Sequence, residues 1–393
     1  MTEKRRLGVS PNVFYLGITS FLTDVSSEMT LTILPLFLSS VLGVGAVVIG
    51  LIEGVAESTA TILRVFSGWL ADRTGKYKGL TVLGYGLSSL AKPVLYFANT
   101  WGLVLGVRFA DRVGKGVRSA PRDALVAASS PVGQRGRSFG FHRALDSYGA
   151  VVGLALAALV VFLSQRTGLE LTRATYQKLV LAGVLPAFLA VAVLVWKVRE
   201  AAVQPEARVA TGGPLPRPFF FFLVIMLVFT LGRFSDAFLI LRAHNLGLSP
   251  FYILVLLVLF NLVYASLALP AGVLSDRLGR RRLLLAGFAI YALIYLGFGL
   301  AREAWQVIFL FVAYGLYYGA TEGVGRAYVA DLVPPARRGT AYGLYHGGVG
   351  LVALPSSVLA GLLWQSISPA APFFLGAGLA GIAMLGLLFL RKA

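Results

Sequence analysis

Between two long apolar runs lies the first dense charge cluster after the N-terminus, Gly68-Trp69-Leu70-Ala71-Asp72-Arg73-Thr74-Gly75-Lys76-Tyr77-Lys78-Gly79. Its glycines and charged side chains predict a tight turn in water and not a lipid-facing helix. The same order of Gly-x-x-x-Asp-Arg-x-Gly and basic residues returns in Gly272-Val273-Leu274-Ser275-Asp276-Arg277-Leu278-Gly279-Arg280-Arg281-Arg282. Two copies half a chain apart indicate two homologous halves.

The composition around these loops is that of a membrane protein. Of the 393 residues 57% are hydrophobic and only 13% are charged, about half the charged fraction of a soluble domain. The apolar residues come in runs of roughly 20, the length of a helix that crosses a bilayer. Backbone groups in lipid must bond within their own segment, so these runs predict an all-α membrane protein.

The apolar runs divide the chain into two sets of six spans. They lie near residues 13–40, 46–71, 80–98, 102–126, 137–164 and 178–198, and near 219–242, 250–275, 283–301, 305–330, 339–364 and 371–390. The stretch 199–218 is polar and rich in glycine and proline, which favours a linker. We therefore predict an N-terminal bundle over 1–198, a cytoplasmic linker over 199–218 and a C-terminal bundle over 219–393.

The net charge of +18 lies mostly in short loops between apolar runs. Its expected role is to fix orientation in the membrane and not to bind nucleic acid. Most basic loops fall on one side of the layout, which predicts a cell (inner) membrane protein with both termini in the cytoplasm. The loop 166–178 is the exception, because it places Arg166, Arg173 and Lys178 outside.

Both charged loops resemble the cytoplasmic loop signature of the major facilitator superfamily, found between helices 2 and 3 and again between helices 8 and 9. A second repeat, Gln134 to Phe141 against Arg337 to Leu344, extends the resemblance over most of the chain. The resemblance implies two six-helix bundles related by pseudo-two-fold symmetry, with a central site that opens alternately to each side. It assigns gating to the residues of both loops and to one arginine of the fourth span: Gly68, Asp72, Arg73, Gly75, Gly272, Asp276, Arg277, Gly279 and Arg122.

The fourth span carries a polar stripe along nearly its whole length. Its members are Arg108, Asp111, Arg112, Lys115, Arg118 and Arg122, which fall within roughly 140° of one helix face. Part of the stripe, Arg108 to Gly116, is similar to the Arg-x-x-x-Arg-x-Gly-x-Gly motif of facilitator antiporters, and the similarity links Arg112 to proton coupling. The alternative is that these arginines, Arg118 and Arg122 above all, brace the bundle and its inner gate.

Carboxylates inside other spans supply candidate partners. Asp24 and Glu28 are one helical turn apart, as are Glu53 and Glu57, so each pair presents two carboxylates to one place. Two carboxylates in a low-dielectric site cannot both ionise easily, as a proton carrier requires. The alternative is ion pairing with the fourth span, and for Asp24 we expect Arg112 as the partner.

The remaining candidates for substrate binding or proton coupling lie in the fifth span and in the second half. They are His142, Arg143, Asp146, Asp236, Glu322, Arg326 and His346. His346 lies among small residues, where a lone histidine more often packs than binds a ligand. After Gly153 the fifth span continues with Leu154, where drug-exporting facilitators carry a Gly-Pro pair, so the antiporter motif is incomplete.

These features together predict a proton-coupled secondary transporter that exports a small amphipathic or cationic solute. The alternatives are transport of an organic anion, phosphate or carboxylate compound by the arginine-rich fourth span, and export of a divalent metal. Cysteine is absent and no catalytic or nucleotide-binding motif occurs, so we expect neither an enzyme nor a cofactor. The expected partners are the substrate, protons and the lipid bilayer, with no nucleic acid, and we expect a monomer.

Overall fold

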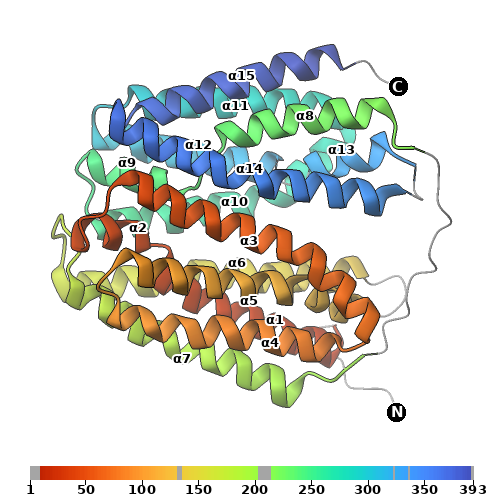
Figure 1. Ribbon diagram of the computed structural model, residues 1–393, viewed down its shortest axis with the longest axis horizontal. Coiled ribbons are helices and arrows are strands. Elements are labelled where there is room, and N and C mark those ends of the chain that lie inside the picture. The colour runs from red at the N-terminus through yellow and green to blue at the C-terminus, as the bar shows by residue number, and fades with distance from the viewer. Residues whose placement is uncertain (1–8, 131–134, 202–213, 322–323, 335–336, 391–393) are drawn as a thin grey trace. The chain divides into compact units, whose positions relative to one another are not determined.

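The computed structural model describes residues 9–130, 135–201, 214–321, 324–334 and 337–390 (Figure 1). The first half contains α1 (Pro11–Leu31), α2 (Leu34–Leu36), the π-helix η1 (Phe37–Val41), α3 (Ala46–Thr74), α4 (Tyr77–Ala91), the 3-10 helix η2 (Lys92–Phe97), α5 (Trp101–Ala128), α6 (Arg135–Gln165) and α7 (Arg173–Lys197). The second half contains α8 (Arg217–Gly232), α9 (Ala237–Asn245), α10 (Pro250–Leu278), α11 (Arg280–Leu300), α12 (Ala304–Thr321), α13 (Val324–Leu332), α14 (Arg338–Ser366) and α15 (Ala371–Phe389).

The helices form two compact units. The first unit comprises Met1–Gly43 and Thr59–Glu206, and the second comprises Val44–Ser58 and Ala207–Ala393. Helix α3 therefore contributes its first half to the second unit and its second half to the first. The predicted linker lies partly outside the described residues, at 202–213, and the predicted boundaries at 198 and 219 stay a prediction.

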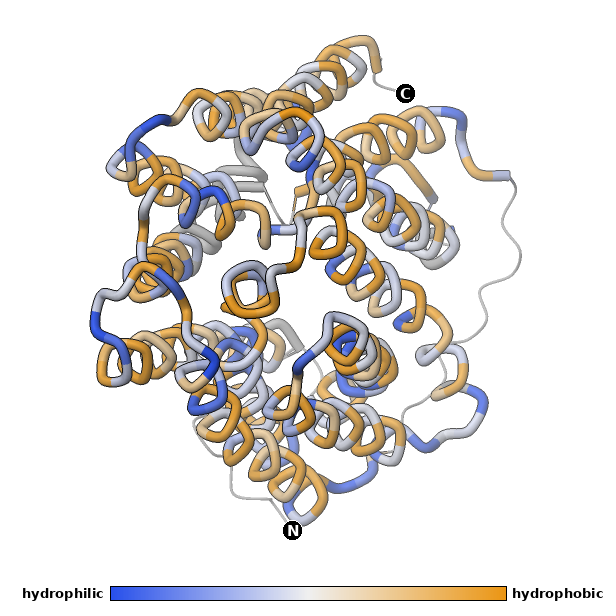
Figure 2. The backbone as a smooth tube through the Cα atoms, turned by 60° about the vertical axis from the view of Figure 1, so that its left-hand side comes forward, coloured by the Kyte–Doolittle hydropathy of each residue, from blue (hydrophilic) through white to orange (hydrophobic). Residues whose placement is uncertain are grey.

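Most helices have the length and apolarity of membrane spans. Eight helical stretches of the described residues are long and apolar enough to cross a membrane, and two shorter apolar helices, Pro250–Tyr264 and Ala304–Tyr318, accompany them. Figure 2 shows hydrophobic residues along most of the helical length, with hydrophilic residues concentrated in the connecting loops. Helix α5 is not among the eight, because its polar stripe places too many charges in any such window.

Small residues let the helices of the first unit approach closely. Helix α1 packs against α6 and α7, and α4 packs against α5. At Gly149 of α6 an added Cβ would lie 2.5 Å from the backbone oxygen of Phe21 in α1, and at Gly153 it would lie 2.7 Å from that of Val25. Such glycines permit close contact between spans. They account for the glycines of the fifth span and fix the distance between α1 and α6.

An apolar core lies where the ends of several helices of the first unit meet. It includes Val13 and Leu16 of α1, Tyr85 of α4, Leu125 of α5 and Leu194 of α7, all fully or almost fully buried. These buried side chains fix the ends of four helices relative to one another.

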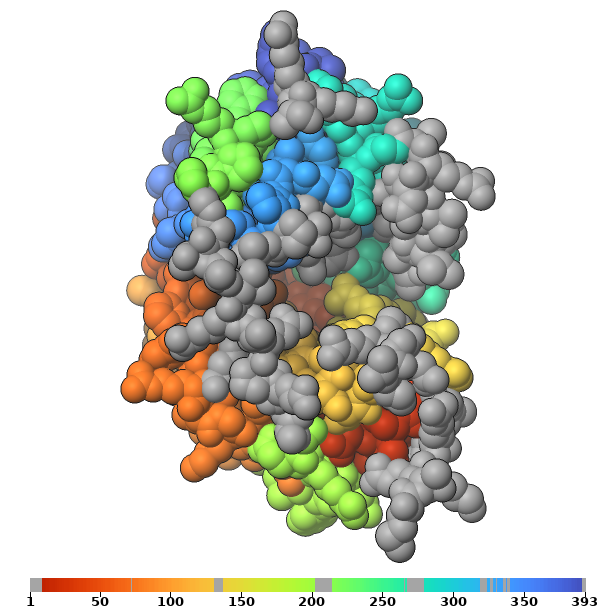
Figure 3. Space-filling model, turned by 90° about the vertical axis from the view of Figure 1, so that its right-hand side faces the viewer, coloured from red at the N-terminus to blue at the C-terminus, as the bar shows by residue number. Residues whose placement is uncertain are grey.

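In the second unit α8 packs against α14 and α15, α10 against α12, and α11 against α15. Figure 3 shows the side chains of α8 in green beside the blue side chains of the C-terminal helices. Gly232 at the end of α8 and Gly376 of α15 meet at the tightest part of this contact, where a Cβ on either would lie within 3.1 Å of the other's backbone oxygen. Close glycine contacts therefore organise this unit as well.

The two repeated loops share a backbone feature. Gly75 has φ +67° and Gly279 has φ +85°, a region that disfavours residues with a Cβ. The N–H of Gly75 donates to the carbonyl oxygen of Ala71 at 2.8 Å, which caps α3. The second glycine of the repeated motif thus marks the turn in both halves.

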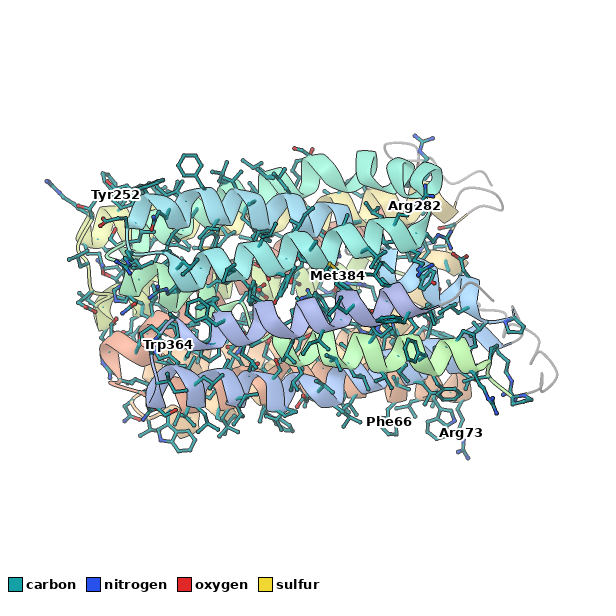
Figure 4. The ribbon with its side chains drawn as sticks, turned by 90° about the horizontal axis from the view of Figure 1, so that it is seen from above. Phe66, Arg73, Tyr252, Arg282, Trp364 and Met384 are labelled. Carbon is teal, nitrogen blue, oxygen red and sulfur yellow. The ribbon has the colours of Figure 1, made fainter. Side chains whose placement is uncertain are left out.

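Side chains near these turns lie at the helix ends. Figure 4 shows Arg73 and Phe66 projecting away from the helices, and the Arg73 guanidinium lies 5.4 Å from the centre of the Trp69 ring. In the second unit Figure 4 places Tyr252, near the start of α10, and Arg282, near the start of α11, at opposite ends of the helices. The structure describes no side chain for Asp72, Asp276 or Arg277, and Gly272 lies in the same stretch, so their gating contacts stay predictions.

Candidate functional site

Ionisable side chains of the first unit gather where α1, α5 and α6 meet. We call this group the ionic cluster; its members are Ser20, Asp24, Arg122, Asp123, His142, Arg143 and Asp146. Asp24 and Asp146 lie at mid-helix on α1 and α6, and the close packing of these helices at Gly149 and Gly153 brings the two carboxyl groups together.

Hydrogen bonds connect the ionic cluster across three helices. The Ser20 hydroxyl on α1 donates to Asp146 Oδ1 on α6, and the Asp24 carboxyl group lies close to that of Asp146. Arg122 reaches the cluster from α5, with its Nη1 3.5 Å from Ser20 Oγ and its Nη2 2.9 Å from Asp123 Oδ1. Two carboxylates this close repel each other, and a proton on one of them relieves the repulsion.

The cluster continues along α6. Arg143 Nη1 lies 3.7 Å from Asp146 Oδ2. His142 is buried, with 5% of its surface exposed, and its Nε2 has no hydrogen-bond partner among the described residues. Asp146 therefore joins Asp24 to the predicted residues His142 and Arg143 on its own helix, which sequence spacing within one helix could not show.

The predicted partner of Asp24 was Arg112, and the structure gives both residues other neighbours. Arg112 Nε lies 3.5 Å from Asp111 Oδ2, the residue before it on α5. Asp24 instead contacts Asp146. Glu28, one turn along α1, accepts a hydrogen bond from Thr32. The ion pair between Asp24 and Arg112 stays a prediction, while the contact with Asp146 is the one that the structure supplies.

Arg118 lies inside the helix bundle of the first unit. Its Nη1 donates to Ser88 Oγ at 2.7 Å, and its guanidinium lies 4.4 Å from the centre of the Tyr85 ring. Both contacts are with α4, and they fit the alternative in which this arginine braces the bundle.

Lys92 is a buried charge that the sequence interpretation missed. It stands where α4 passes into η2, and only 1% of its surface is exposed. Its Nζ donates to Ser26 Oγ at 3.0 Å and to Ser27 Oγ at 2.8 Å, both on α1 between Asp24 and Glu28. The available signal was a lysine inside the apolar run 80–98, because a charge inside a span is a functional candidate by default.

The seventh span of the chain, which is the first after the linker, is broken. Helix α8 ends at Gly232 and α9 begins at Ala237, with residues 233–236 outside the helix. Polar side chains bond the backbone groups that the break frees. The Ser356 hydroxyl donates to the Leu231 carbonyl at 2.9 Å, and the Tyr291 hydroxyl donates to the Gly232 carbonyl at 3.3 Å. A broken span is tolerated where such groups are satisfied within the protein.

The break places two charged residues, Arg233 and Asp236, among aromatic rings. We call this group the aromatic cluster; its members are Arg233, Asp236, Phe260, Tyr264, Tyr314, Tyr317 and Tyr318. Arg233 Nη2 donates to the Tyr318 hydroxyl, and its guanidinium lies 4.8 Å from the centre of the Tyr318 ring. The Tyr314 hydroxyl donates to Asp236 Oδ1 at 2.8 Å.

Both predicted carboxylates of α3 lie in the second unit near this break. Ser235 Oγ lies 3.5 Å from Glu53 Oε2. Glu57 on α3 and Asp236 at the end of the break both have exposed side chains.

The other predicted residues of the second half divide into two groups. Glu322 lies outside the described residues, and the side chain of Arg326 is not described. His346 lies among rings, stacked 6.3 Å from Tyr342 and edge-on 5.2 Å from Tyr345. Among the described residues no three His, Cys, Asp or Glu side chains are grouped so that they could hold a metal ion.

The chain has helical membrane spans with ionisable residues at mid-helix, a broken seventh span and two halves that share a loop motif. These features define a polytopic membrane transporter. The model of the Major Facilitator Superfamily matches residues 16–240 and again 219–393, so the chain belongs to this family. Both the predicted family and the predicted all-helical fold are thereby confirmed.

Known proteins that match nearly the whole length of this chain agree with this assignment. An uncharacterised MFS-type transporter of Methanocaldococcus jannaschii is 37% identical over 390 residues, which cover 97% of this chain and 95% of the relative. The crystal structure of a mutant nucleoside transporter NupG superimposes with a TM-score of 0.80 at 13% identity, covering 97% of this chain and 100% of that one. The second likeness concerns the fold alone.

A shorter match involves a resistance protein. The class C tetracycline resistance protein of Escherichia coli is 37% identical over 133 residues, a third of each chain.

Proposed function

We propose that this facilitator is a proton-coupled secondary transporter that works by alternating access and exports a small amphipathic or cationic solute. It lies in the cell membrane with both termini in the cytoplasm, as the one-sided distribution of its basic loops favours. The match to a tetracycline resistance protein over a third of the chain supports export.

The observation that carries the proposal is that the carboxyl groups of Asp24 and Asp146 lie close together between α1 and α6. Two carboxylates that close repel each other, and one proton held by the pair relieves the repulsion. Arg122 lies close by, 3.5 Å from the serine that bonds Asp146. A substrate or a helix movement that separates the carboxyl groups lets the arginine stabilise both as anions, which releases the proton.

Alternating access can supply such a movement. Asp24 lies on α1 and Asp146 on α6, and the two helices touch backbone to backbone near both residues. A small sliding of one helix along the other would change the distance between the carboxyl groups without exposing apolar surface. Proton release would then follow the conformational change.

Transport by protein reconstituted in liposomes tests this proposal. The substrate is first chosen by thermal shift among organic cations, organic anions and divalent metals, since the stabilisation by a ligand grows with the logarithm of its concentration over its dissociation constant. A pH-sensitive dye inside the liposomes then reports proton movement. Asp24→Asn should abolish proton movement coupled to substrate, a loss of at least about tenfold, and keep substrate exchange without a gradient.

The matched control is Glu303→Gln, which removes an exposed carboxylate from the loop before α12. It should transport protons and substrate as the wild type does. Proton-coupled transport at wild-type rates in both Asp24→Asn and Asp146→Asn would contradict the proposal.

A second candidate function is transport of an organic anion, and Lys92 favours it. This buried cation is held by the hydroxyls of Ser26 and Ser27, and each hydroxyl keeps a hydrogen to donate to an anion. The thermal-shift screen separates the two candidates by the charge of the ligand that stabilises the protein.

A further inference from the structure

We propose that the aromatic cluster of the second unit is a binding subsite for an organic cation with a quaternary or delocalised charge, occupied in this structure by the protein's own Arg233. The proposal rests on the proposed export of a cationic solute, and it adds where and how such a cation binds. Its residues belong to the break after α8, to α10 and to α12, all within the second unit.

The position of the Arg233 guanidinium is the first step of the argument. It lies 4.8 Å from the centre of the Tyr318 ring, inside the distance of about 6 Å at which a cation is attracted by a ring face. The guanidinium is planar and has a delocalised charge, which is the chemistry of the proposed ligand. The protein thus shows which atoms contact a cation at this place.

The surrounding rings form a continuous set that can cover more than one face of a ligand. Tyr314 and Tyr318 meet edge to face at 5.0 Å, and Tyr314 and Tyr317 stack at 6.0 Å. Phe260 from α10 stacks on Tyr314 at 5.6 Å and meets Tyr318 edge-on at 5.7 Å. Two helices therefore supply rings to the same place, and desolvated rings bind cations more strongly than exposed ones.

A carboxylate stands beside the rings. Asp236 accepts a hydrogen bond from Tyr314, which fixes its direction, and it is exposed. A carboxylate next to a ring adds its own attraction for a cation to that of the ring face. This combination of rings and a carboxylate selects an amphipathic cation over an anion or a neutral solute.

The location of Arg233 explains how its side chain can leave the Tyr318 ring. It lies in the non-helical break, where its backbone N–H bonds Thr230 O at 3.0 Å, and its side chain bonds a hydroxyl. The side chain can therefore swing away without unwinding a helix. A ligand cation takes the ring face, and the guanidinium moves to another acceptor.

Binding of radiolabelled tetraphenylphosphonium to the purified full-length protein in detergent tests this site. Arg233→Gln removes the internal competitor and should tighten binding by about 3- to 30-fold, the range that a cation–ring contact supports. Tyr318→Leu should weaken binding by a similar factor. Tyr318→Phe keeps the ring and should stay within about threefold of wild type.

Two further variants separate this site from other effects. Tyr252→Leu removes an exposed ring at the start of α10, away from the cluster, and should bind as wild type. Loss of proton coupling in Asp24→Asn, measured in liposomes, tests the proposed function separately from this site.

Three results would overturn the proposal. The first is absence of tetraphenylphosphonium binding to the wild-type protein. The second is unchanged affinity in both Tyr318→Leu and Arg233→Gln, with thermal unfolding showing that both variants are folded. The third is binding of benzoate that Arg233→Gln abolishes, which would make the guanidinium a ligand for anions and not a stand-in for a cation.

Discussion

The two units carry the same loop motif and hold their mid-helix charges in different ways. In the first unit Asp24 and Asp146 lie close together and Arg122 reaches the same cluster from a third helix. In the second unit the charges of Arg233 and Asp236 are held by tyrosine rings and hydroxyls. Homologous halves have thus kept their turns and diverged in their interiors. A cluster of mutually bonded charges can store a proton, whereas rings around one cation can exchange it for another.

The degree of burial follows the same division. Asp111, on the polar stripe of α5, is 4% exposed, and the nearby cations are Arg112, Lys92, Arg118 and Arg108. Asp236 is exposed. Charges in the first unit therefore depend on one another for stability, because water cannot replace a missing partner.

The largest effect expected from this difference is on stability. Asp111→Asn removes a buried counter-charge from several cations, so it should lower the free energy of unfolding by about 3–5 kcal/mol. The matched change in the second unit, Asp236→Asn, keeps an oxygen that can accept from Tyr314 and should cost under about 1 kcal/mol. Thermal unfolding of both variants in the same detergent makes the comparison. Equal losses would show that burial does not separate the charges of the two units.

A smaller effect concerns the contact that brings α1 and α6 together. Gly149→Ala places a Cβ 2.5 Å from the Phe21 backbone oxygen, so the helices must separate. The cost should be about 1–3 kcal/mol, as for overpacking elsewhere. Gly140→Ala on the same helix is the control, because nothing lies within 4 Å of its added Cβ.

Gly149→Ala also tests proton coupling. Since Asp24 and Asp146 meet across this contact, Gly149→Ala should reduce proton coupling more than it reduces tetraphenylphosphonium binding. Full coupling with a normal unfolding temperature would show that close helix packing is not needed for the carboxyl pair.

The sequence was sufficient to predict the spans and the glycine of each turn, because both depend on local chemistry. The turn itself is shorter than predicted, because α3 continues to Thr74 and α4 begins at Tyr77. Runs of about 20 apolar residues need helices in lipid, and a glycine after Asp-Arg-x fits a turn with positive φ. The partner of Asp24 could not be predicted in this way. Helical spacing shows which residues share a face, but the neighbour of that face depends on how α1 packs on α6.

The aromatic cluster escaped prediction for a different physical reason. Tyr314, Tyr317 and Tyr318 lie in an apolar run, where rings are as favourable against lipid as against protein. No proline marks the break at Arg233 in the sequence, and side chains from α11 and α14 satisfy its backbone groups. Lys92 was detectable as a charge within a span, whereas its serine partners required the packing of η2 near α1.

The smallest expected effect tests what the two units share. Gly75 and Gly279 occupy equivalent places in the repeated motif and both have positive φ. An alanine at either position must adopt a backbone that costs roughly 1–2 kcal/mol for a residue with a Cβ. Nothing lies within 4 Å of either added Cβ, so steric contact does not contribute. Gly75→Ala and Gly279→Ala should therefore lower stability by similar amounts, measured by thermal unfolding. Gly79→Ala, whose φ is not positive, should not lower it. A loss at only one of the two motif glycines would mean that the loops match in sequence while their turns differ in strain, and the symmetry of the halves would then end at the helices.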